Sequence, residues 1–106
     1  MSFDKNSQKL MDCPNKKQKI IHDVMQLKIL SKYFKKIING DKTFEIRKRD
    51  KNFKEGDLLE LREWDGLYFT GRSCLVSISY ILTDEQFEGI THGYCVMSIN
   101  FISNAI

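Results

Sequence analysis

The chain has 106 residues, 42% of them hydrophobic and 29% charged, and its formal net charge is +3. This length predicts one domain, and no apolar run approaches the ~20 residues of a membrane-spanning helix. With three scattered cysteines, two histidines without ligand-spaced neighbours and a polar N-terminus, we expect a cytoplasmic protein with no disulfide framework, metal, cofactor or membrane partner.

Residues 1–21 are rich in Lys, Asn, Gln and Ser and follow neither the helix period nor the strand period, so we expect a disordered basic tail. The single domain is expected over residues 22–106. Within it, residues 28–54 carry a net charge of +7 and residues 55–106 a net charge of −6. If folding keeps these parts separate, the basic side would attract polyanions, whereas mutual pairing of the two parts would cancel that attraction.

Alternating apolar residues predict a first strand that ends at Ile29. A helix over about Lys32–Asn39 follows, with Ser31 as its N-cap. Gly40 is expected just after the helix, because only glycine enters the left-handed region cheaply. The buried stripe of this helix is expected to consist of four residues: Tyr33, Phe34, Ile37 and Ile38.

The next predicted strand is charged. We expect Phe44 and Ile46 on its core face and Glu45 and Arg47 on the opposite face, roughly 6.5–7 Å apart at Cα. Lys42 would enter from the turn before them. A carboxylate, a guanidinium and an ammonium together could orient one polar ligand, and a surface ion-pair cluster is the alternative interpretation.

The predicted strand Leu58–Asp65 contains an anomaly, because Glu63 falls on its apolar face. An unpaired buried charge costs several kcal/mol, so we expect Glu63 at the mouth of a barrel or beside a cation such as Lys42 or Arg47. Trp64 lies on the opposite face. It is either a core residue or a platform on which a base could stack.

Asp65-Gly66 is typical of a two-residue hairpin, and Thr70-Gly71-Arg72 predicts a bulge. Strands Cys74–Leu82 and Tyr94–Ile102 are predicted on either side of an acidic connection at 83–92, which has room for one helical turn. Their inward residues are expected to be Val76, Ile78, Tyr80, Leu82, Cys95, Met97, Ile99 and Phe101. The pattern predicts an α+β, mainly β fold: a small barrel of about five strands with one helix packed at its opening.

Several short segments carry a family resemblance. The string G-x-K-x-x-E-x-R is matched by Gly40, Lys42, Glu45 and Arg47. Further segments follow in the same order: Leu27-Lys28-Ile29-Leu30, Lys32-Tyr33-Phe34, Phe53-Lys54-Glu55-Gly56-Asp57, Leu61-Arg62-Glu63-Trp64-Asp65, Thr70-Gly71-Arg72 and Gly93-Tyr94-Cys95-Val96-Met97. From about His22 to Phe101 the chain resembles the ASCH domain family, and more narrowly a bacterial and phage subfamily of unsettled function. The resemblance implies a PUA-like β-barrel associated with RNA.

These observations together predict a non-catalytic RNA- or nucleotide-binding module, with its cleft between helix 32–39 and the barrel. A polar base edge and a phosphate could both be held there. The expected ligand-binding residues are Lys42, Glu45, Arg47, Glu63 and Trp64, with Arg49 and Lys51 as peripheral phosphate contacts.

Two alternatives stay open. Some small ASCH-like proteins are amidohydrolases that act on acylated cytidine, with a lysine that activates a threonine nucleophile. Lys42 matches that lysine, but Glu45 stands where the threonine would be, and Thr43 is displaced by two residues. We therefore expect no catalytic residue and no acyl-enzyme route. The other alternative is a protein-interaction or regulatory module that uses the acidic second half or the lysine-rich tail.

Overall fold

The structure is a computed structural model that describes residues 24–105, so the expected tail at 1–21 lies outside the described residues. The described part contains five strands and one helix: β1 (Val24–Leu30), α1 (Ser31–Ile38), β2 (Phe44–Lys48), β3 (Leu58–Trp64), β4 (Phe69–Thr83) and β5 (Tyr94–Asn104). The predicted mainly β class with one helix is thus confirmed. No helix of this part is long and apolar enough to cross a membrane.

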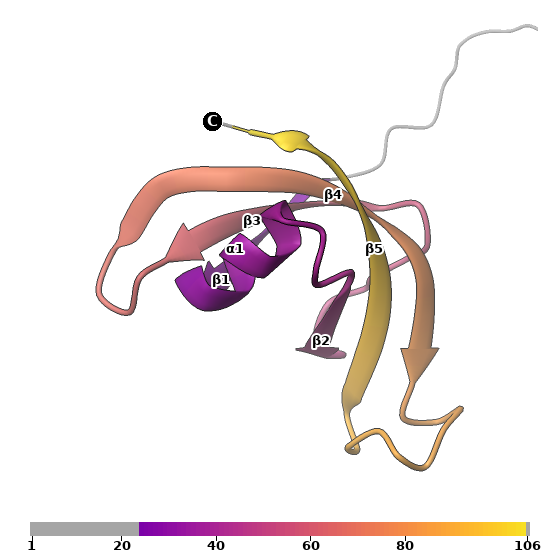
Figure 1. Cartoon of the computed structure of the whole chain (residues 1–106). Coiled ribbons are helices and arrows are strands. Elements are labelled where there is room, and N and C mark those ends of the chain that lie inside the picture. The colour runs from indigo at the N-terminus through magenta and orange to yellow at the C-terminus, as the bar shows by residue number, and fades with distance from the viewer. Residues whose placement is uncertain (1–23, 106) are drawn as a thin grey trace, which may run out of the picture.

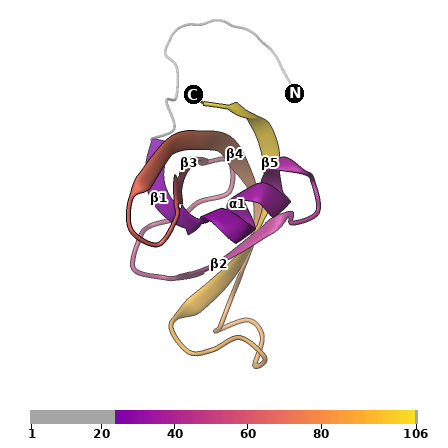
Figure 2. The same cartoon turned by 60° about the vertical axis from the view of Figure 1, so that its left-hand side comes forward.

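All five strands belong to one mixed sheet with the order β1-β3-β4-β5-β2. β1 pairs with β3 in parallel, and the other three pairings are antiparallel. The long strands β4 and β5 bend strongly, so the sheet curls into a half-barrel (Figure 1). Figure 2 shows α1 across the opening of this curl. The curl also brings the edge strands β1 and β2 together, because the Arg47 side chain on β2 donates a hydrogen bond to the Lys28 carbonyl on β1 at 2.9 Å.

The core lies inside the curl and is built by strand alternation, because every second side chain of a strand points to the same face. Two residues of α1, Phe34 and Ile37, close it from the open side. The buried apolar residues are Leu27, Ile29, Phe34, Ile37, Leu59, Leu61, Cys74, Val76, Ile78, Cys95, Met97 and Ile99. Leu27 and Ile29 are the residues that β1 contributes to this core, and Cys74 and Cys95 are buried free thiols.

The helix α1 differs from expectation at its start and on one side. Ser31 is its first residue and not its N-cap; Leu30 holds the cap position, and the Ser31 hydroxyl donates to the Trp64 carbonyl of β3 at 3.5 Å. Tyr33 is 42% exposed and Ile38 is only partly buried. An eight-residue helix can direct only a narrow stripe into so small a core, and Tyr33 falls beside that stripe.

The end of α1 follows the prediction for Gly40, whose φ is +83°. The Gly40 amide donates to the Ile37 carbonyl at 3.0 Å, and the Asp41 amide donates to the Lys36 carbonyl at 2.9 Å. These two hydrogen bonds form a Schellman motif, which satisfies the last carbonyls of the helix. The motif also fixes the path of the chain into β2.

Irregularities change the faces of the last two strands. The register between β4 and β5 shifts between Ile78 and Tyr80, and the extra residue turns Tyr80 outward, so its expected burial is wrong. Phe101 is also exposed, because β2 pairs with β5 only as far as Ser98 and leaves the rest of β5 uncovered on that side. The bulge expected at Thr70-Gly71-Arg72 is present as a register shift between β3 and β4.

The β3–β4 and β4–β5 connections are both built from turns. Four residues, 65–68, separate β3 from β4, and the Asp65 amide donates to the Tyr68 carbonyl at 3.0 Å, so the predicted hairpin is closed around two residues, Gly66 and Leu67. Asp65 organises them, because its carboxylate accepts hydrogen bonds from the amides of Leu67 and Tyr68, each at 2.8 Å. The connection between β4 and β5 consists of turns, and one of them is a single helical turn in which the Phe87 amide donates to the Thr83 carbonyl at 3.2 Å.

Candidate functional site

A groove of about 540 Å³ lies between the two edge strands of the half-barrel. Its walls come from β1, the start of α1, the turn after α1 and β2. The residues that line it are Lys28, Ile29, Leu30, Tyr33, Lys42, Phe44, Glu45, Ile46 and Arg47, and we call it the seam groove. The structure thus brings together three of the predicted site residues, Lys42, Glu45 and Arg47.

Glu45 lies at the base of this groove and is only 4% exposed, so the expected faces of β2 are reversed. Its neighbour in register on β5 is Met97, which points into the core, and directly paired residues share a face. Phe44 and Ile46 consequently point outward and are 43% and 55% exposed. The period of two was predicted correctly, and the assignment of its faces was wrong.

Two cations compensate the buried Glu45 carboxylate. Lys42 Nζ lies 2.7 Å from Oε2, and Arg47 Nε donates to Oε1 at 3.0 Å. Both oxygens are therefore occupied, which is the condition under which a buried charge is tolerated. The cost of burying Glu45 is offset by a fixed pair of positive groups that faces the groove.

The Lys42 ammonium is positioned by the backbone as well as by Glu45. The Lys42 amide donates to the Lys36 carbonyl at 3.0 Å, and its Nζ donates to the Phe44 carbonyl. Nζ also lies 4.8 Å from the ring centroid of Phe44 and 5.6 Å from that of Tyr33. At these distances the aromatic faces attract the cation, so one ammonium is surrounded by a carboxylate and two exposed rings.

Arg47 joins the two sides of the groove. Its Nε is taken by Glu45 and its Nη2 by the Lys28 carbonyl, whereas Nη1 meets no acceptor among the residues that the structure describes. The side chain is 24% exposed. The guanidinium is therefore held in place and still has donors directed away from its fixed contacts.

Trp64 lies outside the seam groove, next to Leu30 in the register of β1 and β3. The Lys28 ammonium sits 4.5 Å from the centroid of its ring, and Phe69 packs against it edge to face at 5.0 Å. One face of the indole is thus already occupied by Lys28. The connection of Trp64 to the groove is indirect, through this lysine.

Glu63 is buried, as expected from its place on the apolar face of β3, but its partner is neither Lys42 nor Arg47. Arg72 donates to both carboxylate oxygens at 2.6 and 2.9 Å, and the Thr70 hydroxyl donates at 2.8 Å. These bonds, above all those from Arg72, lower the pKa of Glu63 to about 2. The expected compensating cation is therefore present, but it is Arg72, because the bulge at Gly71 brings this residue back over β3. The only sequence signal for Arg72 was the Thr70-Gly71-Arg72 motif.

The two peripheral cations have different positions. Arg49 contacts Asp84 at 2.6 Å and Glu85 at 3.6 Å, so it ties the end of β2 to the β4–β5 connection, and the Asp84 hydrogen bond raises the pKa of Arg49. Lys51 is exposed and lines a depression that shares Lys28, Ile46 and Arg47 with the seam groove. Lys51 therefore extends the basic surface of the groove, and Arg49 is engaged elsewhere.

Sequence reasoning missed six of the nine residues that line the groove: Lys28, Ile29, Leu30, Tyr33, Phe44 and Ile46. Tyr33, Phe44 and Ile46 had been assigned to the core, because they fit the apolar periodicity of the helix and of the strand. The sequence did contain a signal. If the two faces of β2 are exchanged, Glu45 points inward between two cations, and Phe44 and Ile46 point outward. Across the described residues, no cluster of His, Cys, Asp and Glu could hold a metal ion.

The two oppositely charged parts of the chain stay largely separate. Among the ion pairs of residues 24–105, only those of Arg49 join the basic part, 28–54, to the acidic part that follows it. Lys28, Lys48 and Lys51 keep their charge at the surface around the groove, without an ion-pair partner in the described part. The expected basic side is thus not cancelled by pairing with the acidic half.

These features define a small half-barrel domain with a cation-lined groove at its open seam. Residues 21–99 match the family described as "Domain of unknown function (DUF3850)", and the chain belongs to this family. It is also similar to the "Uncharacterized 12.9 kDa protein in GpA 3'region" of Escherichia phage P2, with 46% identity over 52 residues. The matched part is 49% of this chain and 45% of that protein, so the similarity spans less than half the length of the relative.

Proposed function

We propose that the protein is a non-catalytic RNA- or nucleotide-binding module that holds its ligand in the seam groove. The observation that carries the proposal is the pair of cations, Lys42 and Arg47, held by the buried Glu45 beside the exposed rings of Tyr33 and Phe44. Phosphates pair with fixed cations, and unpaired bases stack on aromatic faces. The groove offers both kinds of contact within one cavity.

We also infer that the family is a branch of the ASCH domains, which have a PUA-like barrel. Two features support this inference. The sheet curls around a core that a single helix closes, and the residues of the string G-x-K-x-x-E-x-R act as one structural unit. Gly40 ends α1, and Lys42, Glu45 and Arg47 then meet in a single ion-pair cluster.

Binding is favoured over hydrolysis by the contacts of Lys42. Its ammonium donates to the Glu45 carboxylate and to a backbone carbonyl, and no hydroxyl among the described residues is hydrogen-bonded to it, as a nucleophile that gives its proton to the lysine would be. Glu45 itself is buried and has both oxygens engaged. This geometry suits a fixed positive charge that positions an anion.

The proposal is tested by fluorescence anisotropy with a labelled single-stranded RNA of about ten nucleotides. If three phosphates are neutralised, the dissociation constant should rise by roughly 20-fold between 50 and 200 mM salt, because bound counterions are released on binding. A duplex RNA of the same sequence should bind more weakly, since its bases are stacked inside the helix. An anisotropy that stays flat for both RNAs would favour a protein-interaction module instead.

A matched pair of variants tests the groove itself. Tyr33→Leu removes an exposed ring from the groove, and Tyr68→Leu removes a ring that is 72% exposed on the β3–β4 connection. We expect Tyr33→Leu to weaken RNA binding by about 1–3 kcal/mol, the usual cost of losing one base–aromatic stack. Tyr68→Leu should have wild-type affinity. Equal effects of the two substitutions would contradict the placement of the site.

A further inference from the structure

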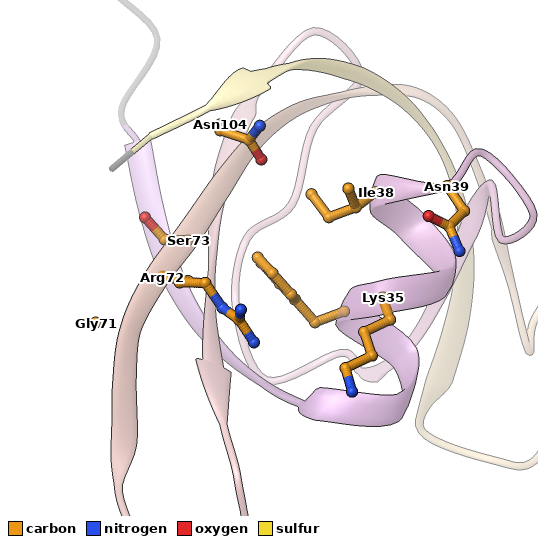
Figure 3. A pocket seen from close by; sticks show the side chains of 8 residues that line it. Lys35, Ile38, Asn39, Gly71, Arg72, Ser73 and Asn104 are labelled. Carbon is orange, nitrogen blue, oxygen red and sulfur yellow. The ribbon is translucent and has the colours of Figure 1, made fainter.

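A second cavity, of about 510 Å³, lies on the other side of α1 from the seam groove. It opens between α1 and the ends of β4 and β5 and shares no lining residue with the seam groove. Figure 3 shows Ile38 of α1, Arg72 of β4 and Asn104 of β5 pointing into it from three sides. The residues that line it are Phe34, Lys35, Ile38, Asn39, Gly71, Arg72, Ser73 and Asn104, and we call it the helix pocket.

The guanidinium of Arg72 is held at the wall of this pocket by a buried partner. Its Nε and Nη2 both donate to Glu63, whose side chain is fully buried, whereas the Arg72 side chain is 63% exposed. Nη1 has no acceptor among residues 24–105. Two bonds to a fixed carboxylate thus orient the group and leave a donor available on the pocket side.

The charge of the helix pocket suits a ligand with one negative charge. Lys35 adds a second cation, and none of the eight lining residues is acidic. Glu63, behind the wall, neutralises one of the two positive charges, so the net local charge is close to +1. A monoanion would be balanced by this charge, whereas a dianion would enter with excess negative charge beside a buried carboxylate.

The remaining surface of the pocket is apolar. Phe34 belongs to the core and is 5% exposed, Ile38 is partly buried against the core, and the Arg72 guanidinium carbon lies 5.9 Å from the Phe34 ring centroid. A flat ring that packs there would meet apolar side chains at the base and a planar cation at the side. Small-molecule sites commonly combine an apolar lining with a few converging polar groups.

We propose that the helix pocket binds a small aromatic carboxylate. Its carboxylate accepts hydrogen bonds from Arg72 Nη1 and Lys35 Nζ, and its ring packs on Phe34 and Ile38. The helix pocket is independent of the seam groove, so this proposal does not depend on whether the protein binds RNA.

The test is a titration of the ¹⁵N-labelled protein, followed by its amide resonances, with 2-naphthoate as the probe. Neutral 2-naphthamide and 2-naphthyl phosphate, a dianion at pH 8, have the same ring and different charges. We expect shifts at the amides of Lys35, Ile38, Gly71, Arg72 and Asn104, with naphthoate binding most tightly. Equal binding of the neutral amide, shifts confined to other surfaces, or no shifts would each overturn the proposal.

Two lysines of the same helix provide a matched comparison. Lys35→Gln removes a cation that lines the pocket, and Lys36→Gln removes one that lies outside it and is 3.9 Å from Asp41. Lys35→Gln should weaken naphthoate binding by about fivefold, as expected for one partly exposed charge pair, and should leave naphthamide unaffected. Lys36→Gln should change neither. If both substitutions weakened naphthoate binding equally, the ligand would be held only by general attraction to a basic helix. That outcome would contradict the proposed site.

Arg72 is tested together with its partner, because Arg72→Gln alone would leave Glu63 buried without a cation. The double variant Glu63→Gln, Arg72→Gln replaces both charged groups by neutral amides. If its amide spectrum is that of a folded domain, naphthoate binding should fall below that of Lys35→Gln. Unchanged binding in the folded double variant would refute the role of Arg72. If the double variant does not fold, the Lys35 and Lys36 pair decides the question alone.

Discussion

Glu45 and Glu63 are both buried carboxylates on inward faces of the sheet, and each is compensated by side chains that lie nearby in sequence. Glu45 is held between Lys42 and Arg47, and Glu63 is held by Arg72. A buried charge without such partners would cost several kcal/mol, so these contacts are conditions of the fold. They also place two sets of cations at two cavities on either side of α1.

Glu63 predicts a measurable pH dependence of stability. Its pKa is lowered from 4.5 to about 2, so the stability that its charge contributes is fully present above pH 4.5 and is lost as the pH falls through about 2. We expect this contribution to be about 1–2 kcal/mol, less than the full shift would give, because water screens the exposed Arg72. This contribution is measured as the decrease in the free energy of unfolding between pH 6 and pH 3, determined by urea denaturation.

The matched variant for this measurement is again Glu63→Gln with Arg72→Gln, which has no titrating group at this position. Its unfolding free energy should fall less between pH 6 and pH 3 than that of the wild type. Carboxylates whose pKa does not depend on this pair, such as Asp84, titrate in both proteins and cancel in the comparison. The same acid loss in both proteins would show that the Glu63–Arg72 pair does not contribute.

The ion-pair cluster of the seam groove could be predicted from the sequence, but the orientation of strand β2 could not. The spacing of Lys42, Glu45 and Arg47 was sufficient to predict that they meet. Hydrophobicity placed Phe44 inward, whereas the register with Met97 places Glu45 inward. Register is set by residues about fifty positions away, and local alternation contains no information about it.

At the scale of elements, α1 and the turn after it determine where the groove lies. The Schellman motif at Gly40 directs Lys42 back toward the helix, and the same short segment ends at Phe44, the first residue of β2. Only two residues of the helix, Phe34 and Ile37, are buried. The hydrogen bonds at its end therefore contribute much of its stability. Changes in this turn should therefore affect both stability and the groove.

Gly40→Ala tests the turn. The φ of Gly40 is +83°, and an added Cβ would meet no atom within 4 Å, so the cost is purely conformational. We expect a loss of about 1–2 kcal/mol in the free energy of unfolding, measured by chemical denaturation followed by circular dichroism. Gly40→Asn should cost less, because asparagine enters the left-handed region more readily. A Gly40→Ala protein as stable as the wild type would show that the turn relaxes without penalty.

The order and number of elements were predictable, because strand alternation, the helix stripe and the turn residues agree with each other along the chain. Their irregularities were not. The bulge near Ser79 and the end of β2 pairing at Ser98 decide that Tyr80 and Phe101 are exposed, and both depend on how strands are paired across the sheet. The helix pocket depends on the same features, since it opens beside the uncovered end of β5.

For the whole molecule, the curl of one five-stranded sheet produces two cavities in a small domain. The sheet does not close by backbone pairing between β1 and β2, and Arg47 bridges them through a side chain. The seam groove lies at this junction, on the side of the molecule that carries the basic part of the chain. The acidic part forms β3, β4 and β5, so a polyanion would be attracted to the basic face and repelled from the acidic one.

The most direct test of the central claim is an amide-resonance titration of the ¹⁵N-labelled protein with a short single-stranded RNA. The proposed function predicts shifts that cluster at Lys28, Leu30, Tyr33 and residues 42–47, with Arg72 and the rest of the helix pocket unaffected. Shifts that cluster instead at the helix pocket or at the acidic connection 83–92, or an unchanged spectrum at saturating RNA, would contradict it.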